Sequence, residues 1–311
     1  MHIPSSLFRS FVIVLAVLVM TSPAWGAEGG TGFGIGPGMV LVENIRPGAD
    51  KVDVFGGTGS FVVYNGTEKA QVFSIAVRKV SGVLGSWELG YRDIPDVSWC
   101  SLDKEELEVP AKSEGKVNLF VKVPDKPELY NQKWMVVVCC SPGKANATGV
   151  VGLQVASRVQ LETLAEPMSK EALGETTVIP SILEMPETQP GTFWTVLTKY
   201  TNNSKEEHTY SLKRIGEVEK EVAHHERYYG KGCTPVLKDE WIELEKPFTL
   251  KPGESKALSM KVNVPDAAKR GKSYEELVFV ADEKGKVTDF LRARSIIALQ
   301  PLADIAPAKK P

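Results

Sequence analysis

The sequence has few of the residues that most often carry enzyme chemistry. Its 311 residues include only four cysteines and four histidines. It contains no G-x-S-x-G, no H-E-x-x-H, no Walker sequence and no G-x-G-x-x-G. Catalysis needs a nucleophile with a base, a carboxylate pair or a metal with an open position, and no pattern here supplies one. We therefore expect no enzyme activity and no cofactor.

Long apolar runs are also scarce, and the one near the N-terminus is short. Arg9 precedes the apolar run Phe11–Met20, and small residues follow at Ser22, Ala24, Gly26 and Ala27. This order is typical of a secretory signal peptide. The run is about half of the ~20 residues that span a bilayer. We expect cleavage near residue 27, export to the periplasm or the extracellular space, and no membrane span in the mature chain.

An excess of one charge is missing as well. Removing residues 1–27 takes away one basic residue, Arg9, and leaves 36 basic and 39 acidic residues, a net charge of −3. Nucleic-acid binding normally needs a concentrated basic face. Nucleic acid is therefore not an expected partner.

What the sequence does have is a weak internal repeat. Asn65-Gly66-Thr67 precedes an apolar strand pattern, and Asn202-Asn203-Ser204 does the same 137 residues later. The run VNLFVKVP at 117–124 matches LSMKVNVP at 258–265. Both runs alternate apolar and polar residues, which is typical of a strand with one buried face.

Short strand patterns separated by turn residues predict an all-β fold of two tandem immunoglobulin-like β-sandwiches. We divide the chain into a signal peptide (1–27), a flexible Gly-rich leader (28–38), module one (34–162), a linker (163–171), module two (172–302) and a flexible tail (303–311). The sequons at Asn65, Asn146 and Asn202 are expected to be ordinary turn residues.

The cysteines lie in a chain expected to be exported, where disulfides persist. Cys139 and Cys140 are adjacent in a strand pattern, so one side chain faces the core and the other faces out. A bond from Cys100 to Cys139 or to Cys140 is the preferred pairing, although four cysteines allow three complete pairings. Cys233 has no partner in module two and is expected to bridge modules, bridge chains or stay free.

The histidines expected in the mature chain, His208, His224 and His225, all fall in module two. They are weak candidates for a metal site, since zinc needs three or four converging ligands. Adjacent strand residues diverge, which argues against joint ligation by His224 and His225. We expect an exposed polar loop and no metal.

Each module carries a long segment rich in aromatic and basic residues, at 81–98 and at 217–240. Such residues form binding hot spots, and aromatic rings also stack on sugars. The competing interpretation is that they cap the sandwich cores. The candidate binding residues are Trp87, Tyr91, Arg92, Tyr228 and Tyr229.

The stretch Glu43–Gly48, the Asn-Gly-Thr turn, Trp99 and the run VPAKSEGKVNLFVKVP at 109–124 resemble bacterial extracytoplasmic Ig-like modules. Such modules occur in WxL-interacting envelope proteins, in glycosidase-associated accessory domains and, more distantly, in two-domain pilus chaperones. The chaperones use a basic anchor between their domains and an exposed edge strand. No single Arg or Lys matches that anchor from the sequence alone.

The resulting hypothesis is an exported scaffold or binding protein whose Ig-like modules contact a protein partner in the envelope or the extracellular space. One alternative is a periplasmic assembly chaperone for strand-donating subunits, which a monomer with a fully covered edge would exclude. Another is a carbohydrate-binding accessory protein, in which Trp87→Ala would abolish binding of a glycan.

Overall fold

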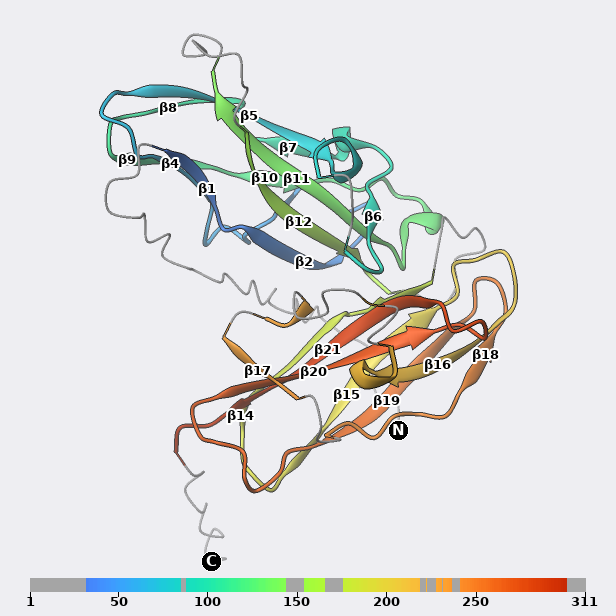
Figure 1. The fold of residues 1–311 in the computed structure, drawn as a ribbon. Coiled ribbons are helices and arrows are strands. Elements are labelled where there is room, and N and C mark those ends of the chain that lie inside the picture. The colour runs from blue at the N-terminus through green and yellow to red at the C-terminus, as the bar shows by residue number, and fades with distance from the viewer. Residues whose placement is uncertain are drawn as a thin grey trace, which may run out of the picture.

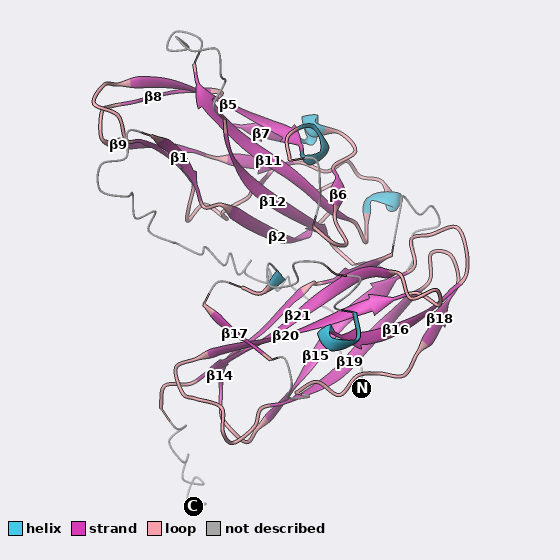
Figure 2. Ribbon diagram, viewed as in Figure 1, coloured by secondary structure: helices cyan, strands magenta, loops and turns pink. Residues whose placement is uncertain are grey.

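The computed structural model describes residues 32–84, 88–143, 154–165, 176–218, 222, 228–230, 232–236 and 241–300. The chain is almost entirely β-structure, arranged as two Ig-like modules that lie one beside the other (Figures 1 and 2). The expected fold class is confirmed. Residues 1–27 and 303–311 lie outside the described residues, so the signal peptide and the tail stay predictions.

Module one contains the strands β1 to β12. One sheet has the order β1 (Phe33–Gly36), β4 (Phe61–Asn65), β9 (Ser113–Val117). A second has the order β3 (Val52–Asp53), β10 (Leu119–Val121), β7 (Cys100–Leu102). The large sheet has the order β2 (Met39–Ile45), β12 (Val155–Thr163), β11 (Lys133–Pro142), β5 (Gln71–Lys79), β8 (Glu106–Val109), and β6 (Arg92–Asp93) pairs with β11.

Module two repeats this plan with the strands β13 to β21. Its small sheet has the order β13 (Thr177–Ile179), β15 (Phe193–Thr201), β19 (Ser255–Asn263). Its large sheet has the order β14 (Ile182–Thr188), β21 (Val287–Ile297), β20 (Ser273–Ala281), β16 (His208–Arg214), β18 (Phe248–Leu250), and β17 (Cys233–Pro235) pairs with β20. The short helix α1 (Ile215–Val218) follows β16.

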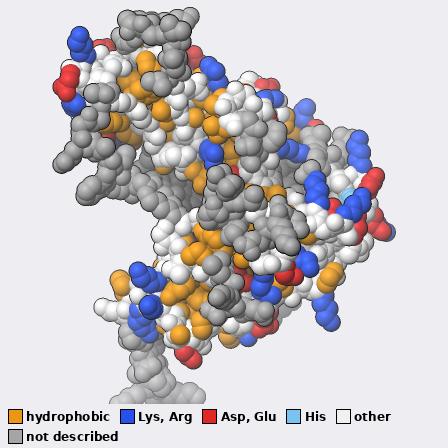
Figure 3. Space-filling view, in the orientation of Figure 1, with side chains coloured by type: hydrophobic (Ala, Val, Ile, Leu, Met, Phe, Trp, Pro, Cys, Tyr) orange, Lys and Arg blue, Asp and Glu red, His pale blue; other side chains and the backbone are white. Residues whose placement is uncertain are grey.

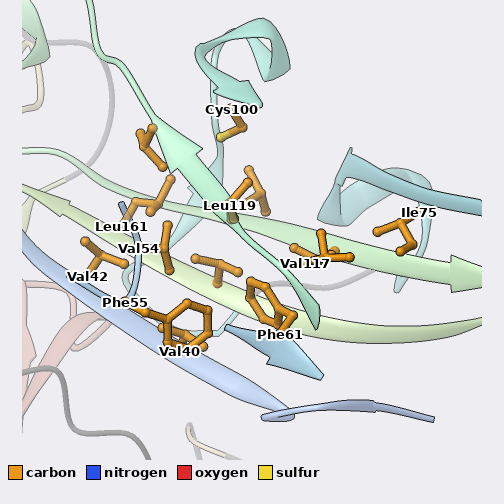
Figure 4. Packing of buried hydrophobic residues seen from close by; sticks show 14 of the residues in the cluster. Val40, Val42, Val54, Phe55, Phe61, Ile75, Cys100, Val117, Leu119 and Leu161 are labelled. Carbon is orange, nitrogen blue, oxygen red and sulfur yellow. The ribbon is translucent and has the colours of Figure 1, made fainter. Parts of the chain in front are cut away.

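The apolar alternation read from the sequence forms the two cores. In module one, Val117, Leu119, Val121 and Val123 are at most 2% exposed, and they pack with Phe55, Phe61 and Val42 (Figure 4). In module two, Leu258, Met260, Val262 and Val264 are likewise at most 2% exposed. Each strand therefore buries the face that its alternation predicts.

The repeated Asn turn has the same hydrogen bonds in both modules. Asn65 Nδ2 donates to the carbonyls of Lys69 and Val109, and its Oδ1 accepts from Thr67 N and Oγ1. Asn202 makes the corresponding four bonds to Glu206, Leu250 and Ser204. Both asparagines are fully buried, so their sequons serve as turns, as expected. Asn146 lies outside the described residues.

The described part of the expected Gly-rich leader contains a strand, at the point where module one was expected to begin. Residues Phe33–Gly36 form β1, which pairs antiparallel with β4 over four residues. The Phe33 ring lies 5.4 Å from the Phe73 ring. A glycine-rich segment keeps its backbone donors and acceptors, so an adjacent unpaired strand is enough to order it.

Among the described residues, no helix has the length and apolar character needed to cross a bilayer.

Candidate functional site

A buried ion pair joins the two modules, and the sequence around neither of its residues predicts it. Lys133 lies at the start of β11 and Asp289 lies in β21, and both side chains are fully buried. Lys133 Nζ lies 2.7 Å from Asp289 Oδ1. It also lies 4.6 Å from the centre of the Tyr91 ring. The buried charge is thus compensated by a carboxylate and by an aromatic face.

Backbone groups complete the environment of Asp289. The N–H of Val178 donates to Oδ2 at 2.7 Å, and the N–H of Phe290 donates to Oδ1 at 2.8 Å. Burial raises the pKa of Asp289, while the Lys133 ammonium and these two N–H groups act in the opposite direction. The three donors on one carboxylate therefore offset part of the rise in the pKa of Asp289 that burial causes.

A second buried carboxylate, Glu162, ties β12 to module two. It accepts a hydrogen bond from Tyr91 OH at 2.5 Å and one from Ser181 N at 3.2 Å, and Ser181 Oγ also donates to it. Burial, and then the charge of Glu162, raise the pKa of Tyr91 well above its usual range. Tyr91 is therefore neutral, and its OH also lies 3.3 Å from Ser181 Oγ of module two.

Glu43 stands beside this cluster on the neighbouring strand β2. Its Oε1 is buried and has no hydrogen-bond partner among the described residues. Burial, and then the charge of Glu162, raise the pKa of Glu43 to about 8. Its carboxyl group is therefore mostly protonated at pH 7.

The long segment of module one packs against module two. Leu89 lies against a cluster of module two that includes Phe279 and Phe290. Gly90, at a φ of +79°, lies so close to Asp289 that an added Cβ would meet its carboxylate. Arg92 donates to Gln132. This segment, which sequence reasoning offered as a binding surface, holds the modules together in this structure.

The corresponding segment of module two also packs inward. The Tyr228 ring lies 4.7 Å from the Phe290 ring in an edge arrangement. Tyr229 is half-buried, and burial raises its pKa to about 12. Trp87 lies outside the described residues. A binding role for these five residues stays a prediction, because packing within the chain does not test it.

The remaining candidates are the cysteines and histidines. The structure records Cys100, Cys139, Cys140 and Cys233 as free thiols, so the preferred bond from Cys100 is absent from it. Cys139 and Cys140 do face opposite sides of β11. Cys140 lies in the main core with Cys100, and Cys139 lies in a separate cluster with Met135 and Val137. Cys139 therefore points away from Cys100.

His208 Nδ1 lies 3.0 Å from Glu283 Oε1, and no group of three potential metal ligands occurs in the described part of the chain. His224 and His225 lie outside it.

The sheet edges offer a surface that the sequence did not single out. The carbonyl of Gly38, the residue before β2, accepts from Arg158 N of β12. Backbone groups alternate sides along a strand, so Met39, Leu41 and Glu43 direct theirs away from β12. No strand pairs with that side of β2 among the described residues. We call this side the β2 edge.

The equivalent edge of module two is different. Arg292 N donates to the carbonyl of Ser181, so Ile182, Glu184 and Pro186 of β14 turn away from β21. Pro186 has no N–H to donate, and Glu184 holds an ion pair with Arg294 at 2.9 Å. Proline and charge are the usual protection of an edge strand. The β2 edge has no proline, and its one acidic residue, Glu43, has a pKa raised to about 8. A comparison of MVLVENI at 39–45 with ILEMPET at 182–188 would have revealed this difference.

No family model matches the chain, and no curated protein does. Solved structures similar to it include a protein of unknown function from Porphyromonas gingivalis W83, at 14% identity over 85% of this chain and 99% of that one, with a TM-score of 0.35. The E. coli chaperone DraB is 10% identical over 85% and 96%, with a TM-score of 0.31. A candidate carbohydrate-binding protein from Bacteroides ovatus is 13% identical over 41% and 38%, with a TM-score of 0.32. None of these likenesses is close enough to transfer a function.

Proposed function

We propose that this chain is an exported binding protein that receives an extended segment of a protein partner along the β2 edge. The observation that carries the proposal is the contrast between two equivalent edges. The β14 edge has Glu184 and Pro186, whereas the β2 edge presents Leu41 and the 37% exposed Met39. An unprotected strand edge binds a further strand through main-chain hydrogen bonds, and the neighbouring side chains give specificity.

The position of this edge supports the proposal. β2 lies on the side of module one that faces module two (Figure 1). The Lys133–Asp289 pair and the Glu162–Ser181 bonds tie the modules together there. A rigid frame lowers the entropy cost of binding an extended segment. Basic and acidic side chains are interspersed over the visible face (Figure 3), so steering by a field of one sign is not part of the proposal.

A chaperone for strand-donating subunits is the narrower form of the same proposal. Such a protein needs an uncovered strand edge, and β2 has one as far as the described residues extend. Lys133 is a basic residue between the modules, but Asp289 already neutralises it. A carboxylate of a partner would have to displace Asp289 to bind Lys133, so we do not assign Lys133 as an anchor.

The test compares matched edge variants in the source cells. The tagged protein is crosslinked mildly, recovered, and analysed by mass spectrometry. We expect one stoichiometric protein with the wild type and at least about a tenfold loss with Leu41→Lys, because a charge protects a strand edge. Ile182→Lys places the same charge on the equivalent edge of module two and should leave recovery unchanged. Equal recovery with both variants, or no partner at all, would contradict the proposal.

A further inference from the structure

Within the described part of the chain, the small sheet of module two has a second uncovered edge, on the side of β15 away from β19. All nine residues of β15 pair with β19, but only Lys199–Thr201 pair with β13 on the other side. In module one, by contrast, β1 covers four of the five residues of β4. The first half of β15 therefore has no strand beside it among the described residues.

Hydrogen bonds on β19 show which residues of β15 face that uncovered side. Asn263 N donates to the carbonyl of Trp241, and the carbonyl of Lys261 accepts from Glu243 N. The backbone groups of Asn263 and Lys261 thus point away from β15. Their opposite residues, Phe193 and Thr195, therefore direct their own backbone groups away from β19. By alternation, Leu197 does the same. Their backbone groups have no strand partner among the described residues.

The side chains along this edge are apolar and exposed. Phe193 is 64% exposed and Leu197 is 65% exposed, while Trp194 and Val196 between them are buried. Lys261 Nζ lies 4.7 Å from the centre of the Phe193 ring, on the outer face. Residues 191–198 contain no charged residue and no proline. This edge therefore lacks the usual protection against pairing.

We propose that a second copy of this chain pairs with residues 193–197 of β15 in an antiparallel, twofold-symmetric manner. With Thr195 on the symmetry axis, Phe193 of each copy lies opposite Leu197 of the other. All three facing pairs are of the hydrogen-bonded kind, because the same three residues direct both backbone groups to the edge. The two small sheets then form one continuous sheet.

The self-complementary pattern is the reason to choose a second copy over an unrelated strand. An isologous interface needs a patch that matches itself under a twofold rotation. The outer face of this segment reads Phe-Thr-Leu, so the rotation places aromatic against aliphatic and Thr against Thr, and both combinations stabilise cross-strand pairs. No like charges meet across the axis. Because β13 pairs with β15 from Lys199 onward, a second copy cannot pair beyond Leu197 on that side. This limit fixes the register of the pairing between the two copies.

The proposal is tested by light scattering after size-exclusion chromatography of the mature full chain, from low micromolar to near-millimolar concentration. We expect the wild type to approach twice the monomer mass as the concentration rises. Leu197→Lys places a cation opposite Phe193 of the other copy, where that copy's Lys261 already lies over the ring, and should raise the dissociation constant at least about tenfold. Tyr64→Lys, on the exposed face of β4 in module one, should leave it unchanged.

Hydrogen exchange gives a second readout that needs no variant. The amides of Phe193, Thr195 and Leu197 should gain protection with concentration, while those of β8 should not. A wild type that stays monomeric at the highest concentration would overturn the proposal. So would a dimer that Leu197→Lys leaves intact, or one whose protected amides lie elsewhere. These readouts do not involve β2, so their failure is distinct from failure of the proposed function.

Discussion

Lys133 and Asp289 form a fully buried ion pair at 2.7 Å although 156 residues separate them in the chain. Each belongs to the large sheet of its own module, so the pair joins the modules directly. Desolvation of two charges costs several kcal/mol, and only good geometry with further hydrogen bonds offsets it. Here Val178 N and Phe290 N supply those further bonds to Asp289.

Removal of both charges should therefore cost less than the two single removals added together. We expect Lys133→Met or Asp289→Leu to lower the free energy of unfolding by about 3–5 kcal/mol, because each leaves an unpaired buried charge. The double variant should lose less than the sum of the two. A double-mutant cycle from urea denaturation measures the coupling. Additive losses would contradict a direct pair.

Gly90 should tolerate no side chain, for two separable reasons. Its φ of +79° costs an alanine about 1–2 kcal/mol, and the added Cβ would also meet the Asp289 carboxylate. Gly285 has a φ of +80° and nothing within 4 Å of an added Cβ. We expect Gly90→Ala to lower the melting temperature clearly more than Gly285→Ala does. Equal losses would mean that the contact with Asp289 has no energetic weight.

Glu43 should make stability depend on pH. Its pKa is about 8 in the folded chain and near 4.5 when unfolded, so the folded state binds the extra proton between these values. Stability should then fall as the pH rises from 4.5 to 8. Glu43→Gln should match the wild type near pH 5 and exceed it at pH 9, by on the order of 1–3 kcal/mol since solvent screens a partly exposed group.

Thermal unfolding from pH 5 to pH 9 measures this difference. Glu114→Gln, at an exposed position on β9, controls for the loss of one formal charge. Glu276 also has a raised pKa, of about 7, and adds a slope of the same sign that both variants keep. A Glu43→Gln variant with the same pH dependence as the wild type would show that Glu43 is not protonated in the folded chain.

Asn65 should stabilise its turn strongly, and its buried side chain should not be glycosylated. Asn65→Ala removes at least four hydrogen bonds at a buried site, which should cost about 2–4 kcal/mol. Asn118→Ala, which loses an exposed bond to Asp103, should cost under about 1 kcal/mol. Expression in a glycosylating host should leave Asn65 and Asn202 unmodified by mass spectrometry. A glycan on either would contradict the buried turn.

The fold could be predicted from local patterns in the sequence, but the contacts between the modules could not. Alternation such as that of Val117, Leu119 and Val121 specifies a buried face whatever lies across the core, so the sequence alone was sufficient. Asn65 and Asn202 were found because their bonds are mostly short in sequence. Lys133 and Asp289 are single charges in apolar strands. That is a signal of a buried partner, but it does not say which partner.

The other differences also concern long-range geometry. The strand β1 was missed because glycine-rich composition predicts flexibility, and its order comes from pairing with β4. The bond expected from Cys100 to Cys139 or Cys140 was chosen because all three lie in module one; only Cys140 shares the core with Cys100, and Cys139 faces the opposite side of the sheet. The β2 edge was missed because an edge is a property of the whole sheet. Only comparison of the two repeats shows that β14 is protected there and β2 is not.

The most direct test of the central claim is site-specific photo-crosslinking in the source cells, with the photoreactive residue at position 41 or at position 184. These positions are equivalent in the two modules, and both direct their backbone groups to an edge. We expect position 41 to capture one defined partner through an extended segment that peptide mapping identifies, and position 184 to capture nothing above background. Equal capture at both positions, or capture at position 184 alone, would contradict binding along β2.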